Sequence, residues 1–189
     1  MDGRALVREG SLTGLIRSLH PLEGYTLMTL ISTHCNLVDS FRSALEEGLA
    51  GDPRFAKAER VDRPDGAMLA TRWPSVENPR VWFEIAVRPG IPQVRVGVLT
   101  DDRWKSEDLE GKIEESGDTM GEFVEMGFDE ADLTWKDPIV EHFREDMKYF
   151  YFATSLDIAT LDDLAKDGTR KKIRQMFDGY YYAFGAFLK

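Results

Sequence analysis

Glu84 is the residue of this 189-residue chain whose type and setting most suggest chemistry. It is a carboxylate inside the strongly apolar run RVWFEIAVRPG, residues 80–90. A carboxylate of this kind can hold a metal ion when a second acid and a cation lie close by. Asp65 is the candidate second acid. The competing interpretation is that Glu84 belongs to the polar face of a strand and has no catalytic role.

Restriction-type nucleases hold a metal beside the scissile phosphate with an Asp on one strand and a Glu-x-Lys on the next. In this chain Ala86 stands where the lysine should be, so Arg88 or Arg95 would have to supply the cation. Asp65 lies in ArgProAspGly, a pattern typical of a turn. The regular alternation around Glu84 favours an ion pair on the outer, wetter face of a hairpin.

His142 and Asp146 form a second candidate metal pair. Asp137-Pro138 predicts the start of a short helix that runs to about Asp146. On that helix, the i, i+4 spacing would place both side chains on one face. The chain has three histidines and no His-Glu-x-x-His or cysteine-rich motif, which favours a solvated charged face. We therefore expect no metal and no cofactor.

His34 and Cys35 are neighbours on an expected helix. Adjacent helical side chains point about 100° apart, which is poor geometry for a catalytic pair. A Cys35 nucleophile served by His142 is the alternative. Packing inside the core is the interpretation that we prefer for both residues.

A dense basic cluster, ThrArgLysLysIleArg at 169–174, opens the last expected helix. Positive charge is unfavourable at a helix N-terminus, so the cluster favours an anionic partner. Neutralisation by aspartates at 162, 163 and 167 is the alternative. The candidate anion-binding residues are Arg170, Lys171, Lys172 and Arg174.

The closing helix is rich in aromatic residues. Its apolar stripe leaves Tyr181 and Tyr182 on other faces, and Gly179 and Gly185 each cost roughly 1 kcal/mol relative to alanine. Glycine there permits close backbone approach. Packing in the core and contact with a partner are both open for this helix. The full set of interaction candidates is Trp73, Trp82, Arg88, Arg95, Tyr181 and Tyr182, with Trp73 and Trp82 as anchors if they are exposed.

These residues must be positioned by an α+β fold. Hydrophobic periodicity predicts helices over 11–19, 25–49, 105–127 (interrupted near 116–118), 137–146, 160–168 and 170–187. It predicts strands over 67–73, 80–88, 93–100 and 148–158. If Arg88 faces Gln93 across the ProGlyIlePro turn, Glu84 faces Gly97 and lies diagonal to Arg95.

The expected fold is a mainly antiparallel sheet of about four strands, a three-strand meander plus one, with helices packed largely on one face. We expect residues 1–189 to form a single α+β domain, in which 1–24 form an N-terminal helical arm.

Composition limits the function. The chain is 42% hydrophobic with a net charge of −10, which favours a folded protein and opposes binding to nucleic acid or anionic membrane. The single cysteine excludes an internal disulfide. There is no long apolar run for a membrane span and no apolar core of a signal peptide. We therefore expect a cytoplasmic protein.

The segment LeuThrTrpLysAspPro at 133–138, the helix before it and the aromatic closing helix carry a resemblance. Over about residues 30–188 the chain resembles small α+β domains at the C-terminal end of some prokaryotic restriction-associated proteins. It is also similar to acidic secretion-chaperone-like folds, small α+β dimers that bind protein. Neither resemblance transfers a functional residue.

The sequence thus predicts a non-enzymatic protein-interaction module of a cytoplasmic prokaryotic system, such as an adaptor, a chaperone-like protein or a regulatory subunit. Its partner would be another protein or a second copy in a homodimer. The alternative is a defence or restriction-associated protein, either a degenerate metal-dependent nuclease-like domain or an acidic mimic of nucleic acid.

Overall fold

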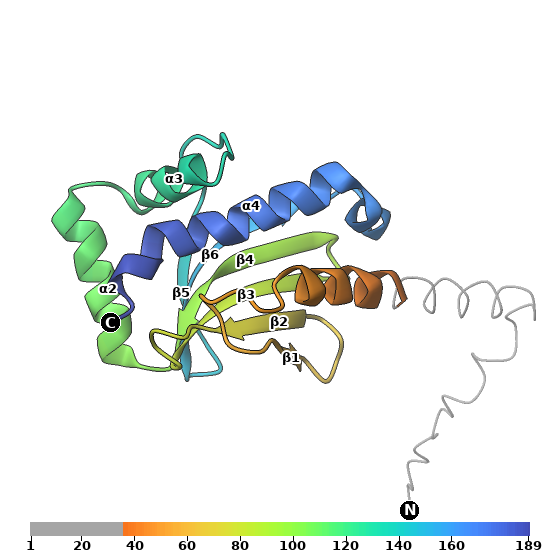
Figure 1. Cartoon of the computed structure of the whole chain (residues 1–189), viewed down its shortest axis with the longest axis horizontal. Helices are drawn as coiled ribbons and strands as arrows, with labels where there is room; N and C mark the ends of the chain where they lie inside the picture. Colours follow the sequence, from red (N-terminus) through yellow and green to blue (C-terminus); the bar gives the residue numbers. More distant parts are fainter. Residues whose placement is uncertain (1–35) are drawn as a thin grey trace, which may run out of the picture. The chain divides into compact units, whose positions relative to one another are not determined.

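A sheet of six antiparallel strands forms the centre of the structure, a computed structural model that describes residues 36–189 (Figure 1). The strand order is β1-β2-β3-β4-β6-β5, so β1 and β5 are the two edges. The strands are β1 (Glu59–Asp62), β2 (Leu69–Pro74), β3 (Val81–Arg88), β4 (Gln93–Thr100), β5 (Glu141–Glu145) and β6 (Tyr149–Asp157). The α+β class and the antiparallel sheet are confirmed.

Between residues 36 and 189, four α-helices and two short 3₁₀ helices accompany the sheet. One helix covers 36–48, and the others are α2 (Arg103–Ser116), α3 (Met120–Glu130), η2 (Leu161–Ala165), α4 (Asp167–Phe184) and η3 (Gly185–Phe187). The predicted arm over 1–24, the helix over 11–19, His34 and Cys35 lie outside the described residues. That the helices lie largely on one face stays a prediction.

The central hairpin has the predicted register. Arg88 pairs with Gln93 and Glu84 pairs with Gly97. Because side chains alternate along a strand, Phe83 and its i±2 neighbours share one face, while Glu84 lies on the other. Register therefore assigns Glu84 and Arg95 to one face, as the alternation in the sequence predicts.

The apolar face of the sheet packs against α4. The ring of Phe177 lies 6.0 Å from the ring of Phe83 and 5.0 Å from that of Trp73. Thr154 of β6 and Tyr180 of α4 share a hydrogen bond of 2.9 Å between their hydroxyls. Figure 1 shows α4 running along the sheet above β4. The aromatic helix is thus mainly a core element.

The sheet has two strands more than the predicted four, and the additional strands are β1 and β5. The residues of β1, GluArgValAsp, are all exposed, so no alternation of apolar and polar residues marks them as a strand. β5 replaces the predicted helix over 137–146. Its sequence has no buried residue, and pairing with β6 decides its conformation. Asp137, with φ 42°, lies in the left-handed region, so no helix begins there.

Capping ends α2 and starts α3 as the sequence predicts. Gly117, with φ 79°, is the left-handed residue after α2. Thr119 and Glu122 form a capping box at the start of α3. After this break, the chain changes direction and α3 packs against α4.

Glycines allow α3 and α4 to touch. A Cβ at Gly127 of α3 would lie 2.3 Å from the carbonyl oxygen of Gly179 in α4 and 2.9 Å from the Cβ of Ala183. A Cβ at Gly179 would meet the ring of Phe128 at 2.4 Å. Close approach of the two backbones thus explains why glycine stands inside the closing helix.

We predict that Gly127→Ala lowers the free energy of unfolding by about 1–3 kcal/mol, because the added methyl overpacks this contact. Gly111→Ala is the matched control: it lies inside α2, and its Cβ would meet nothing within 4 Å. The control should be neutral or gain up to about 1 kcal/mol from helix propensity. Urea unfolding measures both, and equal effects would contradict the proposed contact.

Candidate functional site

Glu84 lies in a buried ion cluster. Its Oε2 accepts a hydrogen bond of 2.8 Å from Arg72 Nε, and its Oε1 accepts one of 3.1 Å from an Arg95 terminal nitrogen. The Tyr151 hydroxyl accepts from Arg72 at 2.6 Å and lies 3.4 Å from Glu84. Both oxygens of the carboxylate are therefore engaged by arginines of the neighbouring strands.

The expectation of a wet outer face is wrong for this cluster. Glu84 is 2% exposed and Arg95 is 6% exposed. Burial alone would lower the pKa of Arg95, but Glu84 and Glu145 outweigh it and raise that pKa. Burial raises the pKa of Tyr151 well above its ordinary value, so the phenol stays neutral. Glu84 is therefore almost fully covered, with both carboxylate oxygens bonded to arginines.

Aromatic rings enclose the guanidinium groups of this face. Arg95 lies 5.0 Å from the Phe143 ring centre and 4.7 Å from that of Tyr151. Arg72 lies 4.7 Å from the ring centre of Tyr149, which in turn meets Trp82 edge-on at 6.0 Å. Cation–π contacts of this kind replace part of the lost hydration of the arginines.

The other interaction candidates differ in exposure. Trp73 is 1% exposed and belongs to the core, so it is not an exposed anchor, although its ring borders a groove described below. Trp82 is half-buried, and Arg88 donates to Gln93 at 2.8 Å. Tyr182 is half exposed, whereas Tyr181 packs on Phe83 at 5.5 Å.

The candidate metal residues do not converge in the described part of the chain. Asp65 is exposed and accepts from the backbone N–H of Ala67 at 3.0 Å within a turn. His142 belongs to β5 and Asp146 to the turn after it, so their predicted helical spacing does not exist. Among residues 36–189, no three His, Cys, Asp or Glu side chains gather as metal ligands.

Three of the four anion-binding candidates line one small groove. Arg170, Lys171 and Arg174 border a cavity of about 270 Å³ between the helix over 36–48 and α4. Arg174 pairs with Asp178 at 2.8 Å, and Arg170 donates to a backbone carbonyl. The fourth, Lys172, lies over the ring of Trp135 at 4.1 Å. Among the described residues, Arg174 alone of the four pairs with carboxylates, and these are Asp178 and Asp52, not the aspartates at 162, 163 and 167.

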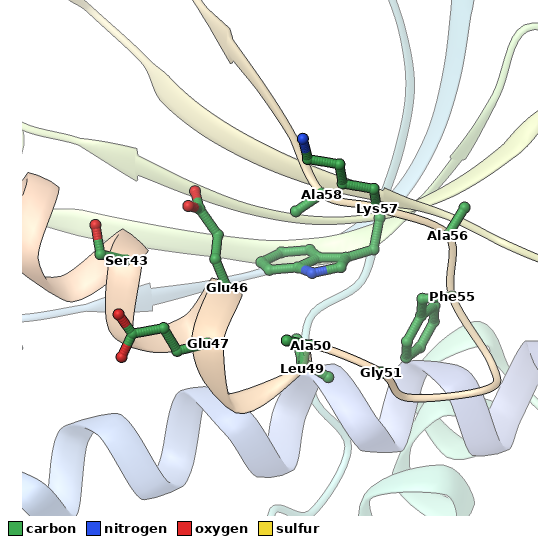
Figure 2. Close-up of a pocket in the computed structure, with 11 residues that line it drawn as sticks. Ser43, Glu46, Glu47, Leu49, Ala50, Gly51, Phe55, Ala56, Lys57 and Ala58 are labelled. Carbon is green, nitrogen blue, oxygen red and sulfur yellow. The ribbon is translucent and has the colours of Figure 1, made fainter.

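A larger groove of about 560 Å³ opens beside the sheet edge (Figure 2). Leu49, Phe55 and Trp73, all buried, form its apolar part. Figure 2 shows the Glu46 and Glu47 carboxylates on the helical side. The remaining lining residues are Ser43, Ala50, Gly51, Ala56, Lys57 and Ala58. The sequence analysis did not predict this groove. The available signal was Phe55, the one aromatic residue between the expected helix over 25–49 and the expected strand over 67–73.

Buried Arg42 holds the helical wall of the groove against the sheet. Its Nε donates to Thr71 Oγ1 at 3.0 Å, and a terminal nitrogen donates to the Ala70 carbonyl at 2.7 Å. The same guanidinium forms a two-point ion pair with Asp62. Helix, β1 and β2 are therefore fixed relative to one another.

A second ion cluster fixes the loop at the end of the groove. Arg54 donates to Asp52 at 2.8 Å and to Asp178 of α4 at 2.7 Å. Its guanidinium also lies over the rings of Phe55 and Tyr181, at 5.0 and 4.8 Å. The Arg54 hydrogen bond holds the pKa of Asp52 below its usual value, against the opposing effect of burial.

Comparison with protein-family models, curated proteins and solved structures finds no match to this chain. The resemblances stated from the sequence stay predictions. Among the helices between residues 36 and 189, none combines the length and apolar character that crossing a membrane requires.

We predict that Glu84→Gln lowers the free energy of unfolding by about 3–5 kcal/mol, because it leaves two buried arginines short of their counter-charge. Glu114→Gln, at an exposed position in α2, should change it by less than about 0.5 kcal/mol. Urea unfolding compares the two variants. An equally small effect at Glu84 would mean that this ion cluster contributes nothing to the fold.

The Asp52 pKa predicts a pH dependence. Because the folded-state pKa lies below the unfolded one, this carboxylate stabilises the fold above about pH 4 and loses its contribution as pH falls through the folded pKa. Asp52→Asn should therefore lower the urea midpoint near neutral pH and have a smaller effect at about pH 2.5. A penalty that does not change with pH would contradict this assignment.

Proposed function

We propose that this chain is a non-enzymatic protein-interaction module that binds an extended segment of another protein in the groove beside β1. The observation that carries the proposal is the position of an apolar groove directly next to an edge strand. Residues 56–58 line the groove and continue without a break into β1. A segment that pairs with β1 would therefore run past the groove opening.

The backbone of β1 supports strand addition. Arg63 N–H donates to the Met68 carbonyl at 2.9 Å, so residues 59, 61 and 63 turn their hydrogen-bonding groups toward β2. By alternation, the backbone N–H and C=O of Arg60 and Asp62 point away from β2. Within residues 36–189, no strand lies on that side. These groups are suited to main-chain recognition of an extended peptide.

The charges of the groove favour a basic partner. Glu46 is engaged by Arg60 at 2.7 Å, but Glu47 is exposed and has no ion-pair partner among the described residues. Glu59 is likewise exposed. Lys57, which also lines the groove and is exposed, offsets one of these carboxylates. The remaining carboxylate and the net charge of −10 favour lysine or arginine next to the side chain that enters the groove. The apolar floor favours a large apolar side chain at that position.

The proposal is tested by selecting a phage-displayed library of random peptides against the folded protein. We expect enrichment of peptides with a large apolar residue flanked by Lys or Arg. Glu47→Lys should weaken binding of a selected peptide by about tenfold. Glu114→Lys changes the net charge equally at an exposed site in α2, and should leave binding unchanged.

Two results would contradict the proposal. No enriched sequence would mean that the groove does not recognise extended peptides. Equal weakening by both lysine variants would mean that the acidic surface as a whole, and not the groove, attracts the peptide. N-methylation of the peptide backbone adds an independent check. Methyl groups on the residues whose N–H faces β1 should abolish binding, whereas methyl groups on the residues between them should leave it unchanged.

A further inference from the structure

The opposite edge of the sheet, β5, is held by few interactions. None of its five residues is buried, whereas Tyr151, Phe152 and Ala153 of the adjoining β6 are fully covered. Apart from its backbone pairing with β6, β5 is attached through the side chains of His142, Phe143, Arg144 and Glu145. It is therefore an edge strand laid over a well-packed surface.

On the Glu84 face, β5 contributes one ring and one carboxylate. The Phe143 ring stacks on Tyr151 with 4.9 Å between ring centres and 2° between planes. Two residues later, Glu145 accepts from Arg95 at 3.2 Å and also from Arg63, which directly follows β1. Glu145 thus links the two edges of the sheet. Burial would raise its pKa, but Arg95 and Arg63 outweigh that effect and lower it.

On the other face, β5 is held by two side chains that are not buried. The His142 ring, half-buried, lies 4.1 Å from the Phe152 ring, and its Nε2 lies 3.5 Å from Glu110 Oε1 of α2. Arg144 is exposed and lies over the ring of Phe150 at 5.0 Å. This face therefore attaches β5 through one ring contact and partly exposed charges.

The surface under β5 is built from strands β3, β4 and β6, with Glu84, Arg95 and Tyr151 as its charged and aromatic groups. The Nε of Arg95 is the only buried side-chain nitrogen or oxygen without a partner among residues 36–189. The chain on each side of β5 carries conformational strain. Asp137 before it, and Asp146 and Met147 after it, all have positive φ without being glycine.

We propose that β5 is a displaceable strand and that β6, with Arg95 and Tyr151, is a second docking site. The segment that binds there is extended and carries an aromatic residue followed, two residues later, by a carboxylate. β5 itself supplies the chemistry of that partner, since its Phe143 and Glu145 occupy these two positions. Main-chain pairing with β6 provides affinity, and the ring and the carboxylate provide specificity. This site is independent of the groove beside β1.

The test uses the full chain and a fluorescein-labelled peptide, IVEHFREDM, with the sequence of residues 139–147. In Glu145→Gln, the attachment of β5 is weakened, so amide exchange in β5 should be roughly tenfold faster while β3 and β4 stay protected. When β5 is detached from β6 in a larger fraction of the molecules, a competing strand binds with higher apparent affinity. The peptide should therefore bind this variant at least about tenfold more tightly than wild type.

Glu141→Gln is the matched control, because Glu141 is an exposed acid of the same strand with no side-chain partner among the described residues. It should behave as wild type in both measurements. A peptide in which Phe143 is replaced by Ala, or Glu145 by Gln, should lose at least about tenfold in affinity for the opened protein. Arg63→Gln removes only the link between Glu145 and the end of β1. Amide exchange in β5 of this variant should therefore be faster than in wild type and slower than in Glu145→Gln.

Three outcomes would overturn the proposal. One is equal exchange of β5 in wild type, Glu145→Gln and Arg63→Gln. Another is the same peptide affinity for wild type, Glu145→Gln and Glu141→Gln. The third is loss of protection in β3 and β4 of both Glu145→Gln and Arg63→Gln, which would mean that β5 cannot leave without unfolding the sheet.

Discussion

A buried carboxylate retains its charge only when protein groups replace the water it has lost, and Glu84 meets this condition through Arg72 and Arg95. Each arginine needs the same compensation, which comes from aromatic rings and from Glu145. The cluster therefore buries the centre of the polar side of the sheet. The recognition sites that we propose lie at the two edges.

The two edges differ in the way they are protected. β1 has outward-facing backbone groups, and Arg60 and Arg42 tie it to the helix over 36–48. β5 is tied down mainly by one carboxylate and one ring. Unpaired edges invite strand addition, so a protein that binds extended segments can use an edge that proteins otherwise cover or charge. The groove at one edge and the strand displacement that we propose at the other would both serve an interaction module.

Alternation in the sequence predicted the β3–β4 hairpin, its register and the meeting of Glu84 with Arg95, because side-chain direction in a strand depends on local geometry alone. Capping residues likewise predicted the break between α2 and α3. Burial of Glu84 escaped prediction because it depends on Arg72 and Tyr151, which come from other strands. β1 and β5 lack any apolar pattern, so only their pairing with neighbours defines them. The groove was missed for the same reason: its walls meet only in the folded chain.

The most direct test of the central claim is residue-resolved amide exchange of β1, measured with and without a peptide that binds the protein. Strand addition at the groove predicts new protection of the Arg60 and Asp62 amides, while Val61, already bonded to β2, changes little. Protection with that alternation would establish β1 as the recognition edge. Unchanged exchange at Arg60 and Asp62 in the saturated complex would contradict the account.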